Sequence, residues 1–308
     1  DYPTDDPVLL HRWSFNGSSD PATWPSDPND PAHPCHDSVG GAGAALFGTA
    51  KITDNTLDLS TNTPHKNEVT DPNSGWATVG MGGTLSSLTD GFTVEVWFYL
   101  HDWSTYGRVL DCGETNQWNE IFLSEVENGG HAGGFDAGFY KDGYDGDIFD
   151  HSFTPLVYNT WHHAVYTRSK SLHQAVLYLD GEPYGTIRTP DTPIDLAPAD
   201  LQPLTCYLGR CYVPGWAVGG LLKGQIDEMR VYGDMMSKAR ARTNYLCGPE
   251  EINCPLVIGC QDVLDEGFSL TYDFNSDCRV NLEDFAQFAA EWLRCIVPTE
   301  EGCEKPWQ

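Results

Sequence analysis

The residues best suited to chemistry lie in one run near the C-terminal end of the chain, at positions 273–284. Oxygen-bearing side chains occupy the first, third, fifth, ninth and twelfth positions of this run, namely Asp273, Asn275, Asp277, Asn281 and Asp284. The seventh position, Arg279, would contribute only its backbone carbonyl. Ca²⁺ is a hard cation that takes six to eight oxygen ligands, and this spacing turns successive oxygens toward one ion. The run therefore predicts a bound Ca²⁺.

The sixth position of this loop departs from the usual pattern, because Cys278 stands where the sharp turn normally takes glycine. A residue with a Cβ must accept a positive φ there, which is uncommon outside glycine. A disulfide at Cys278 could hold the turn in place. The alternative interpretation is a solvated acidic turn that binds no ion.

The elements that must position these residues are mostly strands. Apolar and polar residues alternate through the first three quarters of the chain, most clearly at 91–100, and Gly, Asp, Asn and Pro cluster between such segments. This alternation predicts half-buried strands joined by loops. Many short strands without intervening helices indicate a mainly β protein, an antiparallel jelly-roll sandwich.

The composition changes near residue 248, where Gly248-Pro249 ends a helix-like segment. Beyond it, apolar residues within 282–294 recur at helical spacing. A helical unit this small usually needs a metal ion, disulfides or a partner to stay folded. The expected parts are an N-terminal arm at 1–7, a β-sandwich at 8–248, a linker at 249–259 and an EF-hand-like helical appendage at 260–308.

The bulk composition restricts the partners and the compartment. A formal net charge of −28 over 308 residues argues against nucleic acid or anionic membranes as partners. No apolar run reaches the length of a membrane span. Ten cysteines without zinc-type spacing predict disulfides made in an oxidising compartment. The chain begins at Asp1, which we interpret as a mature N-terminus after signal-peptide removal, and we expect a secreted protein.

A second acidic segment is a further candidate for metal binding. Asp142, Asp145 and Asp147 lie among glycines that permit tight turns, so their carboxylates could gather around another Ca²⁺. The alternative is a solvated loop of negative charge.

Tryptophans are candidates for carbohydrate binding, because exposed aromatic faces stack on the C–H surfaces of sugars. Those expected in or beside loops include Trp103, Trp118 and Trp216. The alternative for each is ordinary packing, which accounts for most tryptophans of a sandwich.

Catalytic motifs are missing from the sequence. No G-x-S-x-G, Walker or H-E-x-x-H pattern occurs, and neither does the E-x-D-x-E pattern of jelly-roll glycosidases. Glu95 stands on a predicted strand, but its neighbours on the same face are not acidic. We therefore expect a protein that is not an enzyme. A polysaccharide lyase or glycoside hydrolase that combines residues from distant strands stays open as the alternative.

Several segments resemble LamG-like (concanavalin A-like, laminin G type 3) domains. They follow the order of that family within residues 8–248, at 9–17, 37–41, 92–97, 161–165, 178–181 and 224–232. The C-terminal part resembles the dockerin-like segments of secreted proteins of planctomycete-type bacteria, with one visible loop instead of two. The resemblance implies a jelly roll that binds Ca²⁺ and serves recognition or adhesion. It also implies a rim Ca²⁺ site, here Asn16, Asp37 and Asp227.

Two functions follow as expectations. The first is extracellular recognition of glycans or cell-surface ligands with the help of Ca²⁺. The second is assembly of copies of this chain, or of other extracellular proteins with it, into a matrix, sheath or filament. In the second, the arm at 1–7 would extend to the sheet edge of a neighbour.

Overall fold

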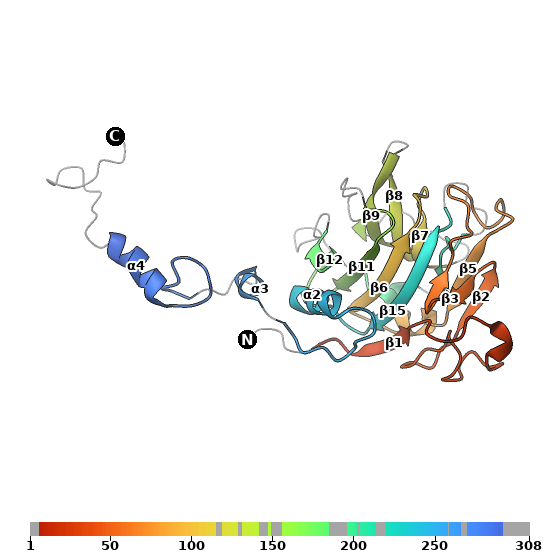
Figure 1. Cartoon of the computed structure of the whole chain (residues 1–308), viewed down its shortest axis with the longest axis horizontal. Coiled ribbons are helices and arrows are strands. Elements are labelled where there is room, and N and C mark those ends of the chain that lie inside the picture. Colours follow the sequence, from red (N-terminus) through yellow and green to blue (C-terminus); the bar gives the residue numbers. More distant parts are fainter. Residues whose placement is uncertain are drawn as a thin grey trace. The chain divides into compact units, whose positions relative to one another are not determined.

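The structure is a computed structural model, and it describes residues 6–114, 119–128, 131–141, 147–148, 156–184, 196–201, 204–213, 220–257, 259–265 and 270–291. Its contacts divide the chain into two units, residues 1–255 and residues 256–308. The first unit contains two antiparallel sheets, which we call sheet A and sheet B (Figure 1).

Sheet A has eight strands, in the order β13-β12-β11-β6-β15-β4-β3, with β1 also paired to β15. Its members are β1 (Leu9–Trp13), β3 (Lys51–Thr53), β4 (Thr56–Asp58), β6 (Phe92–Leu100), β11 (Trp161–Ser169), β12 (Gln174–Leu179), β13 (Glu182–Pro183) and β15 (Gly224–Tyr232).

Sheet B has seven strands, in the order β10-β9-β8-β7-β14-β5-β2. Its members are β2 (Ala44–Gly48), β5 (Gly75–Val79), β7 (Arg108–Gly113), β8 (Glu120–Asn128), β9 (His131–Tyr140), β10 (Asp147–Ile148) and β14 (Thr205–Leu208). A disulfide between Cys112 and Cys206 joins β7 to β14.

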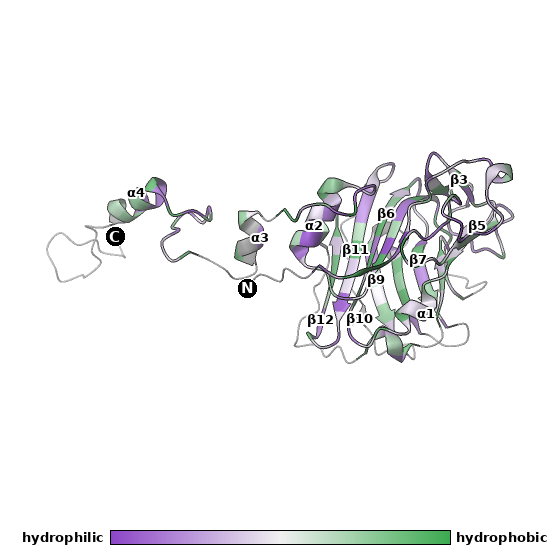
Figure 2. Ribbon diagram, turned by 90° about the horizontal axis from the view of Figure 1, so that it is seen from below, coloured by the Kyte–Doolittle hydropathy of each residue, from purple (hydrophilic) through white to green (hydrophobic). Residues whose placement is uncertain are grey.

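The hydrophobic core lies between the two sheets, and β6 shows why. Phe92, Val94, Val96, Phe98 and Leu100 alternate along this strand and are all buried in the core. Their intervening neighbours belong to the opposite face of sheet A. Figure 2 shows hydrophilic and hydrophobic segments alternating along such strands. This arrangement confirms the predicted antiparallel β-sandwich.

Short helices complete the first unit. The helix α1 spans Gly82–Leu85, and two single 3₁₀ turns occur at Pro21–Thr23 and Pro198–Asp200. The helix α2 spans Lys238–Cys247; it begins after Ser237, whose side chain accepts a hydrogen bond from the backbone of Arg240. Met236 and Ala241 pack on Val165 and Tyr178, so α2 covers the outer face of sheet A.

Residues 249–254, expected to belong to a linker, pack against the sandwich instead. The carbonyls of Pro249 and Glu251 accept hydrogen bonds from Arg230, and that of Cys254 accepts one from Arg240. A disulfide between Cys254 and Cys247 fixes this segment to the end of α2.

The second unit contains α3 (Cys260–Asp265) and α4 (Leu282–Glu291), which flank the acidic loop. Cys260 and Cys278 form a disulfide across this unit. Within the described residues, no helix is both long enough and apolar enough to cross a membrane.

Candidate ligand-binding face and cation sites

The outer face of sheet B carries polar side chains on three adjacent strands. On β8 the residues Ile121 and Leu123 are buried in the core, so Glu120, Phe122 and Ser124 face outward. On β9 the same alternation turns Asp136, Gly138 and Tyr140 outward, because Ala137 and Phe139 are in the core.

Strand register brings these residues together in transverse rows. Arg108 of β7 lies opposite Ser124, which lies opposite Asp136. In the next row, Tyr207 of β14 lies opposite Asp111 of β7, then Phe122 and Gly138. In the third row, Thr205 lies opposite Gly113, then Glu120 and Tyr140. The three rows form one continuous patch of carboxyl, guanidinium, hydroxyl and aromatic groups.

Arg108 connects the carboxyl groups of this patch. Its Nε donates to Oδ2 of Asp111 at 3.0 Å, and its Nη2 lies 3.8 Å from Oε2 of Glu120. The guanidinium also lies 4.4 Å from the centre of the Phe122 ring. All three charged side chains are buried, which strengthens their electrostatic interactions compared with water.

Burial changes the protonation of the two carboxyl groups. Burial raises the pKa of Asp111 well above its ordinary value, and repulsion from Glu120 adds to the effect. Burial also raises the pKa of Glu120, although Arg108 and a hydrogen bond with Asp111 oppose this shift. Both carboxyl groups are therefore harder to ionise here than in water.

An aromatic strip lies beside this pair on β2, β5 and β14. The rings of Phe47 and Trp76 face each other in parallel across two strands, with centres 5.6 Å apart. The guanidinium of Arg210 lies 5.1 Å from the Trp76 ring and 4.8 Å from the Tyr207 ring, and it is paired with Glu68 at 3.2 Å. Phe47 is 42% exposed, and Trp76 and Tyr207 are half-buried.

Sequence reasoning missed this face for a specific reason. Asp136 lies only six residues before the acidic candidates that start at Asp142, so it does not stand out from an acidic loop, whereas the structure places it in β9. The available signal was alternation, because buried apolar residues separate the outward-facing ones on both β8 and β9.

The tryptophan and acidic-loop candidates lie elsewhere. Trp103 is half-buried and packs edge-on against His65, with ring centres 4.5 Å apart. Trp118, Trp216, Asp142 and Asp145 lie outside the described residues. Asp147 is the first residue of β10, and only its backbone is described.

Of the three residues in the predicted rim site, Asp37 makes its own separate set of hydrogen bonds. This buried carboxylate accepts hydrogen bonds from the backbone N–H groups of Arg12, Gly40 and Ala42 and interacts with His11 at 2.6 Å. Burial raises the pKa of Asp37, but these hydrogen bonds outweigh it and lower the pKa to about 2. Both oxygens of Asp37 therefore already have hydrogen-bond partners within the sandwich.

Asn16 and Asp227 both interact with another carboxylate, that of Glu250. The Asn16 amide donates to both oxygens of Glu250 at 3.0 and 3.1 Å, while its own Oδ1 is buried without a hydrogen-bond partner among the described residues. Burial raises the pKa of Asp227 to about 7, and repulsion from Glu250 and Glu228 contributes. Oxygen atoms of Asn16, Asp227 and Glu250 thus share one region, in which Arg12 and Arg230 offset part of the negative charge.

The loop at 273–284 gathers its carboxylates as its spacing predicts. One oxygen from each of Asp273, Asp277 and Asp284 lies within 4.8 Å of the others. Asp273 accepts hydrogen bonds from the backbone of Asp277 and Cys278, and Asp284 accepts them from Phe274 and Asn281. Hydrogen bonding from the Asn281 backbone lowers the pKa of Asp284 and favours its charged form. Three carboxylates and nearby amide oxygens suit Ca²⁺.

The sixth position of this loop has the geometry expected for it. Cys278 has a φ of +62°, a value that glycine adopts with less strain, and its disulfide to Cys260 ties the turn to α3.

A buried ionic network lies on the outer face of sheet A, around Glu95. The Glu95 carboxylate interacts with His163 at 2.8 Å, accepts from the Tyr232 hydroxyl at 2.7 Å and accepts from the Asn244 amide at 2.9 Å. Arg230 lies 3.4 Å away. Burial raises the pKa of Glu95, but Arg230 and His163 outweigh it and hold the pKa at about 2. Glu95 is fully buried and its oxygens have partners, so it is structural.

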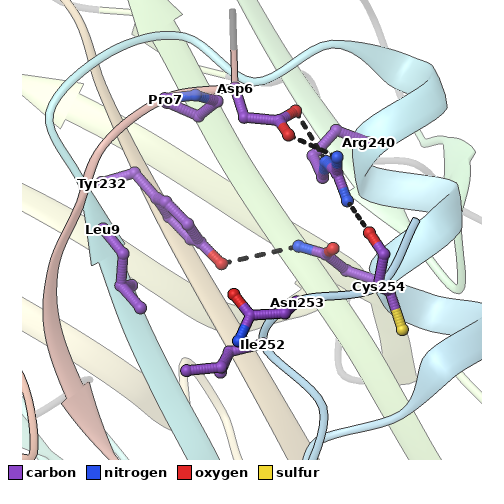
Figure 3. A pocket seen from close by; sticks show the side chains of 9 residues that line it. Asp6, Pro7, Leu9, Tyr232, Arg240, Ile252, Asn253 and Cys254 are labelled. Atoms are coloured by element: carbon purple, nitrogen blue, oxygen red, sulfur yellow. Dashed lines mark hydrogen bonds and ion pairs between the residues drawn. The ribbon is translucent and has the colours of Figure 1, made fainter. Parts of the chain in front are cut away.

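A cavity of about 340 Å³ lies above this network, between β15, α2 and the segment at 252–254 (Figure 3). Asp6 and Arg240 form an ion pair at one side. Tyr232 and Asn244 also line the cavity, and the Asn244 amide donates to the Tyr232 hydroxyl. The ion pair ties the start of the described chain to α2. This residue of the predicted N-terminal arm thus contacts its own sandwich.

Comparison with known proteins identifies the fold family. Residues 71–241, more than half of the chain, match the laminin G type 3 model, described as the concanavalin A-like lectin/glucanases superfamily. The chain belongs to this superfamily. No curated protein matches the sequence.

Solved structures agree with the superfamily at the level of fold. A botulinum neurotoxin D/C binding domain has a TM-score of 0.50 and 10% identity, over 78% of this chain and 52% of that structure. Domain 4 of an extracellular arabinanase from Geobacillus stearothermophilus has a TM-score of 0.47 and 14% identity, over 77% and 98% of the two chains. A CBM40 from a Ruminococcus gnavus sialidase has a TM-score of 0.44 and 18% identity, over 63% of this chain and 94% of that structure. This chain spans about half the length of the neurotoxin structure.

Proposed function

We propose that this chain is an extracellular, non-catalytic protein that recognises glycans through the outer face of sheet B. The observation that carries the proposal is the aromatic strip of Phe47, Trp76 and Tyr207 directly beside hydrogen-bonding groups. Sugar rings present C–H faces that stack on aromatic rings and hydroxyls that need polar partners. A site for them combines both features.

The carboxyl groups of this face favour binding over hydrolysis. A glycosidase needs two carboxyl groups that reach the scissile bond from either side, whereas Asp111 and Glu120 are only 0% and 5% exposed. This burial favours recognition over a glycoside hydrolase.

Substitution of one strip residue tests the site. Trp76→Ala removes a stacking surface without entering the core, and we expect it to weaken binding of a glycan-array hit by about tenfold, measured by calorimetry. Trp161→Ala is the matched control, because Trp161 is 41% exposed on sheet A. Equal affinities for the Trp76 variant and the wild type would rule out this face.

We further propose that the second unit binds Ca²⁺ through Asp273, Asn275, Asp277, Asn281 and Asp284, with the Arg279 carbonyl. Support comes from the converging carboxylates and the position of Cys278. The region of Asn16, Asp227 and Glu250 is proposed as a second, weaker cation site. Bound Ca²⁺ would neutralise carboxylates that otherwise repel one another. Three disulfides among the described residues are typical of extracellular proteins and support secretion.

Assembly is a second candidate function, favoured by the apolar surface of the second unit. A groove of about 210 Å³ there is lined by Tyr272, Phe274, Val280, Asn281, Asp284, Phe285 and Phe288. Phe285 is 62% exposed and Val280 55% exposed. Electron microscopy and light scattering in Ca²⁺, repeated after chelation, test this function. Polymers that dissolve in chelator support it, and a monomer in both conditions excludes it.

A further inference from the structure

We propose that the glycan bound by sheet B is a neutral polysaccharide chain, and that glycans carrying carboxylates, such as polyuronates and sialylated glycans, are not bound there. This inference rests on the proposed function and names the class of sugar. Its basis is the set of side chains that sheet B presents to solvent around the aromatic strip.

Core and outward-facing residues alternate on β2, β5 and β14, so one side of this part of sheet B meets solvent. The outward-facing residues are Ala45, Phe47, Trp76, Thr78, Thr205 and Tyr207. None of the six carries a charge, and each is exposed or half-buried. A ligand on this side therefore meets aromatic rings, small side chains and hydroxyl groups.

The arginines of this part of sheet B are buried and already paired. Arg210 is 6% exposed, pairs with Glu68 at 3.2 Å and donates from Nε to the Cys211 carbonyl at 2.9 Å. Arg108 is 3% exposed and pairs with Asp111 at 3.0 Å. Breaking a buried ion pair is costly, so neither guanidinium is available to a carboxylate of a ligand.

The charge of the whole chain acts in the same direction. A formal net charge of −28 produces a negative potential around the protein, and this potential repels anions. The carboxylates of polyuronates and sialylated glycans are ionised near pH 7, so their approach is opposed. A neutral polysaccharide meets no such repulsion.

Two threonines supply the polar contacts that a neutral sugar needs. Thr78 lies opposite Tyr207 in the register, and Thr205 precedes Tyr207 by two positions on β14, so both hydroxyls are on the same side as the ring. A threonine hydroxyl can both donate and accept a hydrogen bond. Sugar hydroxyls do the same, so the two groups can pair in either direction.

The borders of the strip fit a chain in preference to a single terminal sugar. On one side, β2 is the last strand of sheet B, so the strip is open beyond Phe47. On the other side, the Tyr212 ring covers Gly113 of β7, where a Cβ would lie only 2.3 Å from the ring. Ala45 is small and keeps the surface low between the aromatic side chains. Consecutive sugar rings can therefore lie across the strip and continue past β2.

Binding measurements on the full chain test the inference. An array of neutral, sialylated and uronic-acid glycans identifies the ligands, and calorimetry then compares the best hexose oligomer with the same oligomer oxidised to carboxylates at C6. We expect neutral ligands on the array and at least about tenfold tighter binding of the unoxidised oligomer. Its affinity should depend little on salt, because no ion pair forms.

A charge introduced at the strip provides a second readout. Thr205→Lys places an ammonium group on the exposed side beside Tyr207, so it should shift the preference toward the oxidised oligomer by at least about tenfold. Thr89→Lys is the matched control, because Thr89 is an exposed threonine between α1 and β6, outside sheet B. It adds the same charge and should leave the preference unchanged. Thermal unfolding checks that both variants fold.

The other outcomes overturn the inference in distinguishable ways. Equal or tighter binding of carboxylated glycans, in a way that Trp76→Ala weakens, contradicts the neutral class and leaves the proposed function intact. Equal shifts in Thr205→Lys and Thr89→Lys contradict a ligand beside Tyr207. Failure of every glycan on the array to bind contradicts both the inference and the proposed function.

Discussion

At the residue scale, the protein contains carboxyl groups of three kinds. Asp37 and Glu95 are buried with complete sets of partners, and their pKa values fall to about 2. Asp111 and Glu120 are buried with incomplete partners, and their pKa values rise. Those of the 273–284 loop are close together near the surface. Residue type alone does not separate these kinds, because partners and burial set the pKa.

Glu95→Gln tests the first kind. The substitution removes the carboxylate that Arg230 and His163 share, although Arg230 keeps its ion pair with Glu228, so we expect a loss of about 3 kcal/mol in the free energy of unfolding. The pKa of Glu95 is lowered on folding, so its stabilisation is present above about pH 4.5 and is lost as the pH falls toward 2. Urea unfolding from pH 7 to pH 3 should show the difference between wild type and variant shrinking. A constant difference, or none, would contradict the network's role.

Asp227→Asn tests the rim region, where the substitution is expected to stabilise the folded protein. Folding raises the pKa of Asp227 to about 7, so its destabilising effect is absent below about pH 4 and grows as the pH rises to 7. In chelator the variant should therefore unfold at a higher temperature than the wild type at pH 8, and at the same temperature at pH 4. In Ca²⁺ the gain at pH 8 should disappear or reverse. A gain that Ca²⁺ does not change would remove this region from the cation sites.

At the element scale, the sequence predicts β6 and α4 well and the outer face of sheet B poorly. Strict alternation in Phe92–Leu100 and helical spacing within 282–294 predict a strand and a helix, and the structure contains both. The core side of β6 is buried, whereas the apolar side of α4 is exposed, with Phe285 62% exposed. Gly138 breaks the pattern of β9 because it makes room for the Phe122 ring, against which a Cβ would clash at 2.3 Å. Long-range register, which brings Arg108 to Ser124 and Asp136, leaves no local signal in any of the three strands.

The loop between α3 and α4 yields a prediction at this scale. Asp273→Ala with Asp277→Ala removes two of three converging carboxylates, so the second unit should lose Ca²⁺-dependent protection from proteolysis. The first unit has its own core and two of its own disulfides, and its melting should not change. Ser276→Ala in the same loop is the control, since its side chain is not in the carboxylate group. Unchanged protection in the double variant would exclude Ca²⁺ binding at this loop.

At the scale of the whole molecule, the chain joins a superfamily β-sandwich to a small acidic unit. The net charge of −28 means that copies of the chain repel one another unless cations are bound. Ca²⁺ bound at the loop of the second unit would reduce this charge.

The central claim is that glycans bind to the outer face of sheet B, and a crystal structure with a bound oligosaccharide tests it most directly. The account predicts a sugar ring stacked against Trp76 or Tyr207. A sugar bound in the cavity above Glu95, or at the rim beside Asn16 and Glu250, would contradict it.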